Sequence, residues 1–232
     1  MKKTQFDFEQ GEILLVDKPL RWTSFDVVNK IKHATKQRKV GHGGTLDPMA
    51  TGLLVICIGR AATKRLDEFQ NDDKTYTGTI TLGATRPSYD LETPITEAFD
   101  IGHISAADVR EVARLFHGEM EQLPPIYSAI KKDGKPLYES ARKGIAVEVE
   151  ARKIVIHRFE ITSVELPDVH FLIRCSKGTY IRSIAHDFGQ ALQNGAYLSA
   201  LRRTQSGNFD IAEAWNLDEL VEVLRRDRTE TK

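Results

Sequence analysis

The segment from Gly41 to Pro48, GHGGTLDP, holds the densest group of unusual residues in the chain. Its three glycines let the backbone approach a ligand closely or adopt positive φ angles. Pro48 favours an extended conformation at Asp47, which would direct the carboxylate away from its own backbone. A loop of this kind, held by a rigid scaffold, could form part of an active site. Composition alone favours the simpler interpretation that Asp-Pro is a turn, and the segment lacks the Gly-Lys-Ser/Thr ending of a phosphate-binding loop.

Two further positions could carry chemistry. In the segment 177–183, KGTYIRS, a strand passes into a helix at a glycine, which places Tyr180 and Arg182 in the first helical turn. An arginine there could hold a carboxylate ionised and oriented, although an arginine at a helix start is more often simply solvated. Tyr76 lies in the middle of a predicted strand, where a tyrosine usually serves packing.

Length and composition are those of an ordinary globular protein. The 232 residues are 41% hydrophobic and 28% charged, which excludes disordered, collagen-like and membrane classes and predicts one compact domain over 1–232. Cys57 and Cys175 lack the spacing of a zinc site, so we expect buried thiols. Acidic residues interrupt any apolar signal core near the N-terminus, and no apolar run reaches 18 residues. We therefore expect a reduced, cytoplasmic protein.

Charge is balanced overall but not along the chain. The 33 Lys and Arg residues offset 33 Asp and Glu residues, which argues against a simple polycation. Residues 21–65 nevertheless carry a net +7, and residues 66–128 carry −8. The basic block could form a face that binds a polyanion, or it could be the solvated surface of helices.

The elements that must position these residues follow from hydrophobic periodicity. Strands are predicted over 13–16, 53–58, 74–82, 145–161, 170–175, 196–203 and 207–211. Helices are predicted over 25–34, 105–116, 138–143, 181–192 and 217–224. Thr23 or Ser24 is the expected N-cap of the first helix, and Thr179 that of the helix from 181. Because strands and helices do not alternate regularly, the predicted class is α+β, with a mixed, mainly antiparallel sheet flanked by helices.

Six blocks of sequence, in order between residues 11 and 209, resemble the TruB family of tRNA pseudouridine synthases. They are GEILLVDKP, KVGHGGTLDPMATGLLVICIGRAATK, KTYTGTITLG, PPIYSAIKKDGKPLYESARKG, CSKGTYIRSIAHDFG and LSALRRTQSGNF. Each block alone is weak, whereas six in register are specific. The resemblance implies the pseudouridine synthase fold and favours the active-site interpretation of the GHGGTLDP segment.

The resemblance implies three catalytic residues. The aspartate of the family's GHxGxLDP loop is the nucleophile, and it corresponds to Asp47. The tyrosine of the KxY strand, here Tyr76, stacks on the target uracil and is the suspected base for ribose deprotonation. The arginine of GTYIRS, here Arg182, pairs with the catalytic carboxylate.

Other residues are implied to bind substrate. His42 corresponds to a histidine that fills the space left by flipped T-loop bases, Tyr180 lies against the substrate, and Leu201 closes over the pocket. The Lys18-Pro19 motif is expected to be mainly structural. The expected phosphate contacts lie in the basic block: Lys30, Lys32, Lys36, Arg38 and Lys39.

The implied reaction converts uridine to pseudouridine at position 55, in the T loop of tRNA. It breaks the N–C glycosidic bond, turns the base and rejoins it through carbon, so no cofactor or metal is expected. The stacked target base must first flip out of the RNA, at a cost of a few kcal/mol that an aromatic platform offsets. Two alternatives stay open: a synthase of the same lineage that acts on another RNA, and a non-catalytic RNA-folding module.

Two departures from the family pattern stand out. Position 43 is Gly where the family often has Thr or another small residue, which should loosen the loop slightly. About 23 residues follow Phe209, too few for the C-terminal RNA-binding PUA domain of many bacterial members. We therefore expect a short form without a PUA domain, a monomer that binds the T arm of tRNA and no membrane.

Overall fold

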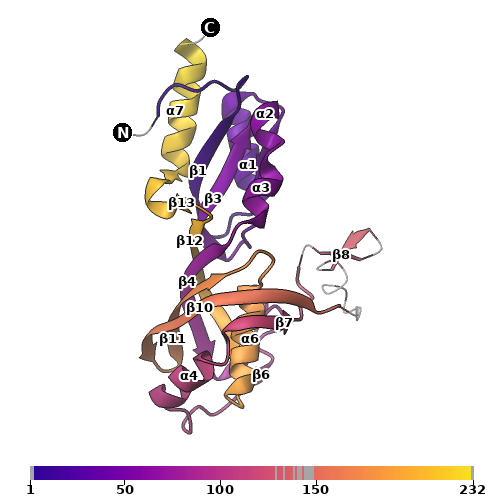
Figure 1. The fold of residues 1–232 in the computed structure, drawn as a ribbon, viewed down its shortest axis with the longest axis vertical. Helices are drawn as coiled ribbons and strands as arrows, with labels where there is room; N and C mark the ends of the chain where they lie inside the picture. Colours follow the sequence, from indigo (N-terminus) through magenta and orange to yellow (C-terminus); the bar gives the residue numbers. More distant parts are fainter. Residues whose placement is uncertain are drawn as a thin grey trace. The chain divides into compact units, whose positions relative to one another are not determined.

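The computed structural model describes residues 3–128, 130–132, 134–137, 139, 143 and 149–230. The chain forms two compact units (Figure 1). Unit 1 comprises residues 1–76 and 202–232, and unit 2 comprises residues 77–201. Two strands, β4 (Lys74–Leu82) and β12 (Ala196–Ser206), contribute residues to both units.

The sheet of unit 1 is built on two long strands, β1 (Glu12–Lys18) and β3 (Ala50–Ile58). They pair antiparallel from Glu12–Ile58 to Lys18–Gly52, and the short strand β14 (Trp215–Asn216) pairs parallel with β1. The remaining elements of the unit are α1 (Ser24–Thr35), β2 (Val40–His42), α2 (Arg60–Thr63), α3 (Leu66–Asn71), β13 (Phe209–Asp210), the 3-10 helix η1 (Ile211–Glu213) and α7 (Leu217–Glu230).

Strand β3 is buried on both faces, because helices cover the sheet on each side. Leu54, Ile56 and Ile58 pack with apolar residues of α1 and α7, whereas Leu53 and Val55 pack with residues of α2 and α3. Successive side chains of a strand point to opposite faces, so a continuous apolar run is what a doubly covered strand requires. Two apolar layers therefore hold the strand that follows the Asp47 loop.

Unit 2 contains further strands of the sheet to which β1 and β3 belong, with helices packed against them. The order of its strands is β12-β4-β11-β10-β7. Strand β10 (Arg152–Glu165) pairs antiparallel with both β11 (Asp168–Cys175) and β7 (Gly118–Gln122). The other elements are β5 (Ala84–Thr85), β6 (Glu97–Ala98), α4 (Ala106–Ala113), β8 (Lys131–Lys132), β9 (Lys135–Pro136) and α6 (Ile181–Ala191).

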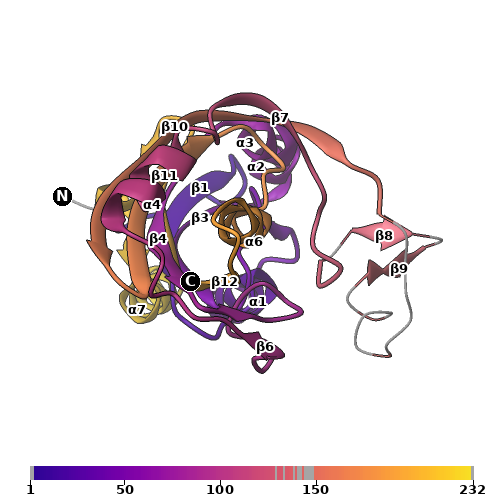
Figure 2. The ribbon, with the colours of Figure 1, turned by 90° about the horizontal axis from the view of Figure 1, so that it is seen from below.

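Four phenylalanines form the centre of unit 2. Phe116 and Phe188 approach Phe159 with ring centroids 5.9 and 5.7 Å apart, and Phe171 lies 6.1 Å from Phe159. Edge-on and tilted pairs at these separations are favourable. Figure 2 shows α6 on the inner side of the curve made by β10 and β11. The cluster therefore fixes α6, the helix that carries Arg182, on the sheet.

The α+β class and the mixed, mainly antiparallel sheet are confirmed. The predicted strand 74–82 agrees with β4 at both ends, and the predicted helix 25–34 lies within α1, capped by Thr23. Residues 145–148 of the strand predicted over 145–161 lie outside the described residues, and so does most of the helix predicted over 138–143.

Three local predictions are wrong. Gly41 and His42 belong to β2 and not to a loop, because they pair with Cys57 and Ile56 of β3. Thr179 is not the N-cap of α6; Tyr180 holds that position, and the Thr179 hydroxyl donates to the Ser176 carbonyl at 2.9 Å.

The third concerns the strand predicted over 207–211. Residues 207 and 208 form a turn, strand β13 covers only Phe209 and Asp210, and Ile211 begins η1. The Asp210 side chain accepts a hydrogen bond from the Ala212 backbone, and this cap ends the strand and starts the 3-10 turn.

Candidate active site

The Asp47 loop joins β2 to β3 in unit 1 and is anchored on both sides of the aspartate. Before it, the Leu46 N–H donates to the Ser24 hydroxyl oxygen at 2.8 Å, and that hydroxyl donates to the Leu46 carbonyl at 3.1 Å. After it, the Pro48 carbonyl accepts from the Arg21 N–H at 2.7 Å. Ser24 is the first residue of α1 and is buried. The helix start and the loop are therefore held together by paired hydrogen bonds.

Arg203 of β12 anchors the beginning of the same loop. Its side chain is buried, with Nε donating to the Leu53 carbonyl at 2.7 Å and Nη2 donating to the Gly44 carbonyl at 3.1 Å. A Cβ at Gly52 would lie 2.3 Å from the Arg203 carbonyl oxygen, so only glycine allows the two strands this close. Because a buried guanidinium needs acceptors for its donors, the loop backbone and Arg203 fix one another.

A second buried cation, Lys18, lies at the end of β1. Its Nζ donates to the carbonyls of Pro19 and Trp22 at 3.0 and 2.6 Å. Burial lowers the pKa of Lys18 from 10.5 to about 8, and the negative charge of Asp47 acts in the opposite direction. The ammonium of Lys18 and the carboxylate of Asp47 therefore interact electrostatically. The contacts of Lys18 Nζ with two backbone carbonyls are compatible with the mainly structural role expected of the Lys-Pro motif.

His42 and Tyr76 are the other predicted site residues of unit 1. His42 lies in β2 opposite Ile56 and is half-buried. Burial, and then the charge of Arg203, lower the pKa of His42, so its ring is neutral at neutral pH. Tyr76 is buried in β4 and is the last residue of the segment 1–76, the first of the two segments that make up unit 1.

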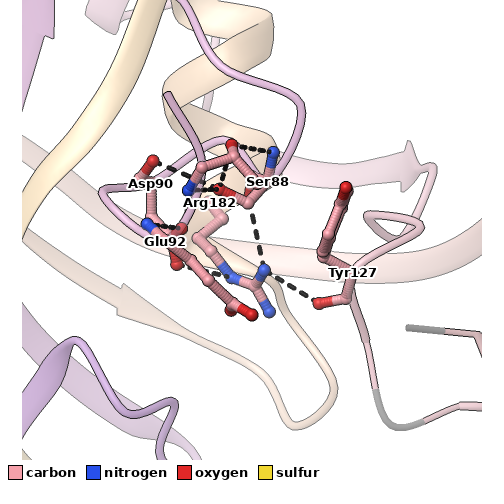
Figure 3. Close-up of polar contacts among 6 residues, drawn as sticks. Ser88, Asp90, Glu92, Tyr127 and Arg182 are labelled. Carbon is pink, nitrogen blue, oxygen red and sulfur yellow. Dashed lines mark hydrogen bonds and ion pairs between the residues drawn. The ribbon is translucent and has the colours of Figure 1, made fainter. Parts of the chain in front are cut away.

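In unit 2, Arg182 is almost fully buried near the start of α6. Its Nη1 donates to the carbonyls of Ser88 and Tyr127 at 3.2 and 2.9 Å, and its Nε lies 3.7 Å from an Asp90 carboxylate oxygen (Figure 3). The other Asp90 carboxylate oxygen accepts from the Glu92 N–H at 2.9 Å. Asp90 is itself buried, so each charge compensates the other.

The backbone of Tyr180 is fixed by Gln122 at the end of β7. The Tyr180 N–H donates to Gln122 Oε1 at 2.8 Å, and Gln122 Nε2 donates to the Tyr180 carbonyl at 3.0 Å. The guanidinium carbons of Arg152 and Arg182 lie 5.1 and 6.0 Å from the centre of the Tyr180 ring. This paired contact sets the start of α6 at Tyr180 and explains why Thr179 does not cap the helix.

The predicted site residues are divided between the units. His42, Asp47 and Tyr76 belong to unit 1, whereas Tyr180, Arg182 and Leu201 belong to unit 2. The pairing of Arg182 with Asp47 stays a prediction. Each half is built from contacts within its own unit.

Sequence reasoning missed three residues that shape the two halves: Asp90, Gln122 and Arg203. Asp90 falls in the acidic block 66–128, where the sequence gives it no role of its own. Arg203 was noticed only as part of the LRRTQSGNF block. For both residues the sequence shows only a charged side chain, which does not identify its partner.

The five predicted phosphate contacts differ in their surroundings. Lys30 forms an ion pair with Asp218 and lies 4.9 Å from the centre of the Trp22 ring. Lys36, Arg38 and Lys39 are exposed after the end of α1, and Lys32 is half-buried. The exposed residues of this set are the better placed to meet a polyanion.

Among the described residues, His, Cys, Asp and Glu side chains do not gather in groups of three or more that could bind a metal ion. In the same part of the chain, each helix is too short or too polar to cross a membrane.

Comparisons with known proteins identify the family of the chain. Residues 32–181 match the model of the TruB family pseudouridylate synthase N-terminal domain, and residues 182–232 match that of the tRNA pseudouridylate synthase B C-terminal domain. A tRNA pseudouridine synthase B of Flavobacterium johnsoniae is 50% identical over 229 residues, which is 96% of this chain and 100% of that protein. One of Chlorobaculum tepidum is 49% identical over 94% of this chain and 92% of its own length.

Solved structures agree as well. A chain in the crystal structure of a Cbf5-Nop10-Gar1 complex is 30% identical, with a TM-score of 0.72 over 93% of this chain. A chain of an archaeal box H/ACA sRNP Nop10-Cbf5 complex is 26% identical, with a TM-score of 0.71 over 97% of this chain. The present chain spans 54% and 57% of those two chains. By its family models and its relatives over nearly the whole length, this chain belongs to the TruB family of pseudouridylate synthases.

Proposed function

We propose that this chain isomerises uridine to pseudouridine at position 55, in the T loop of tRNA, with Asp47 as the nucleophile. The observation that carries the proposal is the Asp47 loop, which Ser24, Arg21 and Arg203 anchor and which Lys18 supports with a buried charge. A nucleophile fixed on a rigid scaffold is what catalysis by positioning requires.

The reaction balances without a cofactor. The bond between N1 of uracil and C1′ of ribose breaks, the base turns, and a bond forms between C5 and C1′. The proton on C5 leaves, and N1 ends with a proton, so the product is an isomer of the substrate. An ionised carboxylate at Asp47 can attack the target nucleotide and leave again. We propose that no metal or cofactor takes part.

The remaining residues have proposed roles around this step. The Tyr76 ring stacks on the flipped uracil, and this stacking offsets the cost of removing the uracil from the RNA stack. Tyr76 is also the proposed general base that deprotonates the ribose. Arg182 pairs with the carboxylate of Asp47. His42 fills the space left by the flipped bases, and Tyr180 lies against the substrate.

Binding of the T arm completes the proposal. Leu201 closes over the bound base, and the phosphate contacts come from the basic 21–65 block: Lys30, Lys32, Lys36, Arg38 and Lys39. We propose that both units act together as one catalytic domain, that the chain works as a monomer and that it acts in the cytoplasm, where its substrate is found.

The test uses an unmodified tRNA transcript that carries tritium at C5 of uridine. Because isomerisation breaks the C5–H bond, each turnover releases one tritium into water. We expect tritium release and one pseudouridine at position 55 with the wild-type chain, and loss of release with Asp47→Asn. If the Asp47→Asn variant released tritium at a near-normal rate, the assignment of Asp47 as the nucleophile would be overturned.

The same assay separates the alternatives. Release from an unmodified ribosomal RNA fragment, and not from tRNA, would favour a synthase that acts on another RNA. An absence of release from either RNA, combined with tight tRNA binding, would favour the RNA-folding module.

A further inference from the structure

A stacked pair of aromatic rings lies beside the Arg182 network of unit 2. The rings of Tyr89 and His186 have centroids 4.1 Å apart and planes inclined by 13°. Tyr89 is the residue between Ser88 and Asp90, which both contact Arg182 (Figure 3). His186 follows Arg182 by four residues in α6, so the two side chains lie on the same face of the helix. The stack therefore joins the two segments that meet at the guanidinium.

The backbone at Tyr89 adopts a conformation that bulky residues rarely take. Its φ is 62°, in the left-handed region. The Tyr89 N–H donates to the Arg86 carbonyl at 3.0 Å, and its carbonyl accepts from the Leu198 N–H at 2.9 Å. Such a conformation persists only where the surroundings hold it. The stack on His186 is one of the contacts that do so.

Both rings are neutral at neutral pH. Burial lowers the pKa of His186, and burial together with the charge of Asp187 raises the pKa of Tyr89. His186 Nδ1 is buried and has no hydrogen-bond partner among the described residues. A neutral imidazole does not repel the guanidinium one turn away, so the pair acts by packing and not by charge.

We propose that Tyr89 and His186 are positioning residues for Arg182. Their stack holds the turn at 88–90 against α6, and this fixes the Ser88 carbonyl and the Asp90 carboxylate on the guanidinium. The inference rests on the proposed function, because the orientation of Arg182 affects catalysis only if the chain carries out that reaction. The pair acts through Arg182 and not on the RNA.

The first test compares Tyr89→Gly with Gln193→Gly. Both residues belong to unit 2 and have positive φ angles, 62° and 53°, but only Tyr89 is stacked on His186. Each variant places a glycine at a positive φ angle and so removes the same kind of backbone strain. We expect Tyr89→Gly to lower kcat on the order of 10-fold with little change in KM, as for lost orientation of a catalytic group. Gln193→Gly should keep the wild-type kcat, and Tyr89→Phe, which keeps the ring, should restore most of it.

A double-mutant cycle tests whether the effect passes through Arg182. In an Arg182→Lys background, Tyr89→Gly should have almost no further effect on kcat. The inference would be overturned if Tyr89→Gly lowered kcat by the same factor in the wild-type and Arg182→Lys proteins. It would also be overturned if the Tyr89→Gly protein were as active as Gln193→Gly. If Tyr89→Gly does not fold, His186→Leu removes the stack without changing the backbone at 89, and the same results are expected.

A readout that does not depend on activity keeps this inference separate from the proposed function. The Nε–H signal of Arg182 in a ¹⁵N–¹H NMR spectrum, assigned by its loss in Arg182→Lys, should shift or broaden in Tyr89→Gly and not in Gln193→Gly. An unchanged signal contradicts the positioning role. A wild-type protein without tritium release contradicts the proposed function instead.

Discussion

Replacement of Ser24 by Ala removes one oxygen atom and both hydrogen bonds to Leu46, the residue before Asp47. The Leu46 N–H and carbonyl lie at 2.8 and 3.1 Å from that oxygen in a buried site. A buried backbone group without its partner costs about 1–3 kcal/mol, so the loss of partners for two groups should lower the unfolding free energy by about 2–6 kcal/mol. That is a large part of the roughly 5–15 kcal/mol that stabilises a typical domain.

Catalysis should suffer as well, because the loop loses its attachment to α1 directly before the nucleophile. A displacement of about 1 Å at a catalytic group can cost on the order of 100-fold in rate. We expect Ser24→Ala to lower the single-turnover rate of tritium release by about 10- to 100-fold. Stability is measured by urea denaturation, followed by the fluorescence of Trp22 and Trp215, the two tryptophans, which both lie in unit 1.

Thr23→Ala is the matched control. Thr23 precedes Ser24 and caps the same helix, but its hydroxyl bonds to Asp26 and not to the loop. Loss of an N-cap costs about 1 kcal/mol, so this variant should be slightly less stable and retain its rate. Equal rates in the two variants would refute the view that Ser24 anchors the nucleophile.

Three further predictions concern the buried cations and the basic face. Arg203→Lys keeps the charge but lacks the forked guanidinium, whose Nε and Nη2 bind the Leu53 and Gly44 carbonyls, so stability should fall by about 2 kcal/mol in urea denaturation. An unchanged midpoint would count against the anchoring role. Burial lowers the pKa of Lys18 from 10.5 to about 8, so over that range the unfolded chain binds a proton that the folded chain releases, and stability should rise with pH. Subtracting the stability curve of Lys18→Met from that of wild type isolates this rise, and a flat difference would contradict it. The double variant Lys36→Glu, Lys39→Glu should weaken tRNA binding and lower the slope of log affinity against log salt concentration by about one per lost phosphate contact. Lys30→Gln should have a smaller effect, because Lys30 already pairs with Asp218. An unchanged slope in the double variant would remove this surface from the RNA interface.

Local sequence predicted the elements well wherever one physical effect dominated. The alternation of KTYTGTITL indicates β4 at both ends, and the apolar run LLVICI indicates β3, because a doubly covered strand has no polar face. The prediction narrows the N-cap of α1 to Thr23 or Ser24, and Asp26, at the capping-box position after Thr23, is the local signal that selects Thr23. These features depend only on neighbours in the chain.

The contacts that shape the site were not accessible in the same way. Gln122 fixes Tyr180 as the N-cap of α6, in place of the expected Thr179, through two hydrogen bonds that span 58 residues of sequence. Arg203 reaches the Leu53 carbonyl across 150 residues. Their residue types permit many partners, and only the tertiary fold selects one. The identity of Asp47, by contrast, followed from the resemblance of a whole motif.

The division of the chain into a continuous and a discontinuous unit has a consequence for the order of folding. Residues 77–201 contain all of unit 2, so that unit can acquire its core while synthesis continues. Unit 1 must wait for residues 202–232, which bring α7 and the end of β12. Closing contacts over such a separation is slow, because the entropy of the intervening loop opposes it. The Asp47 loop is among the first segments made and among the last to be fixed, since Arg203 arrives after nearly all of the chain exists.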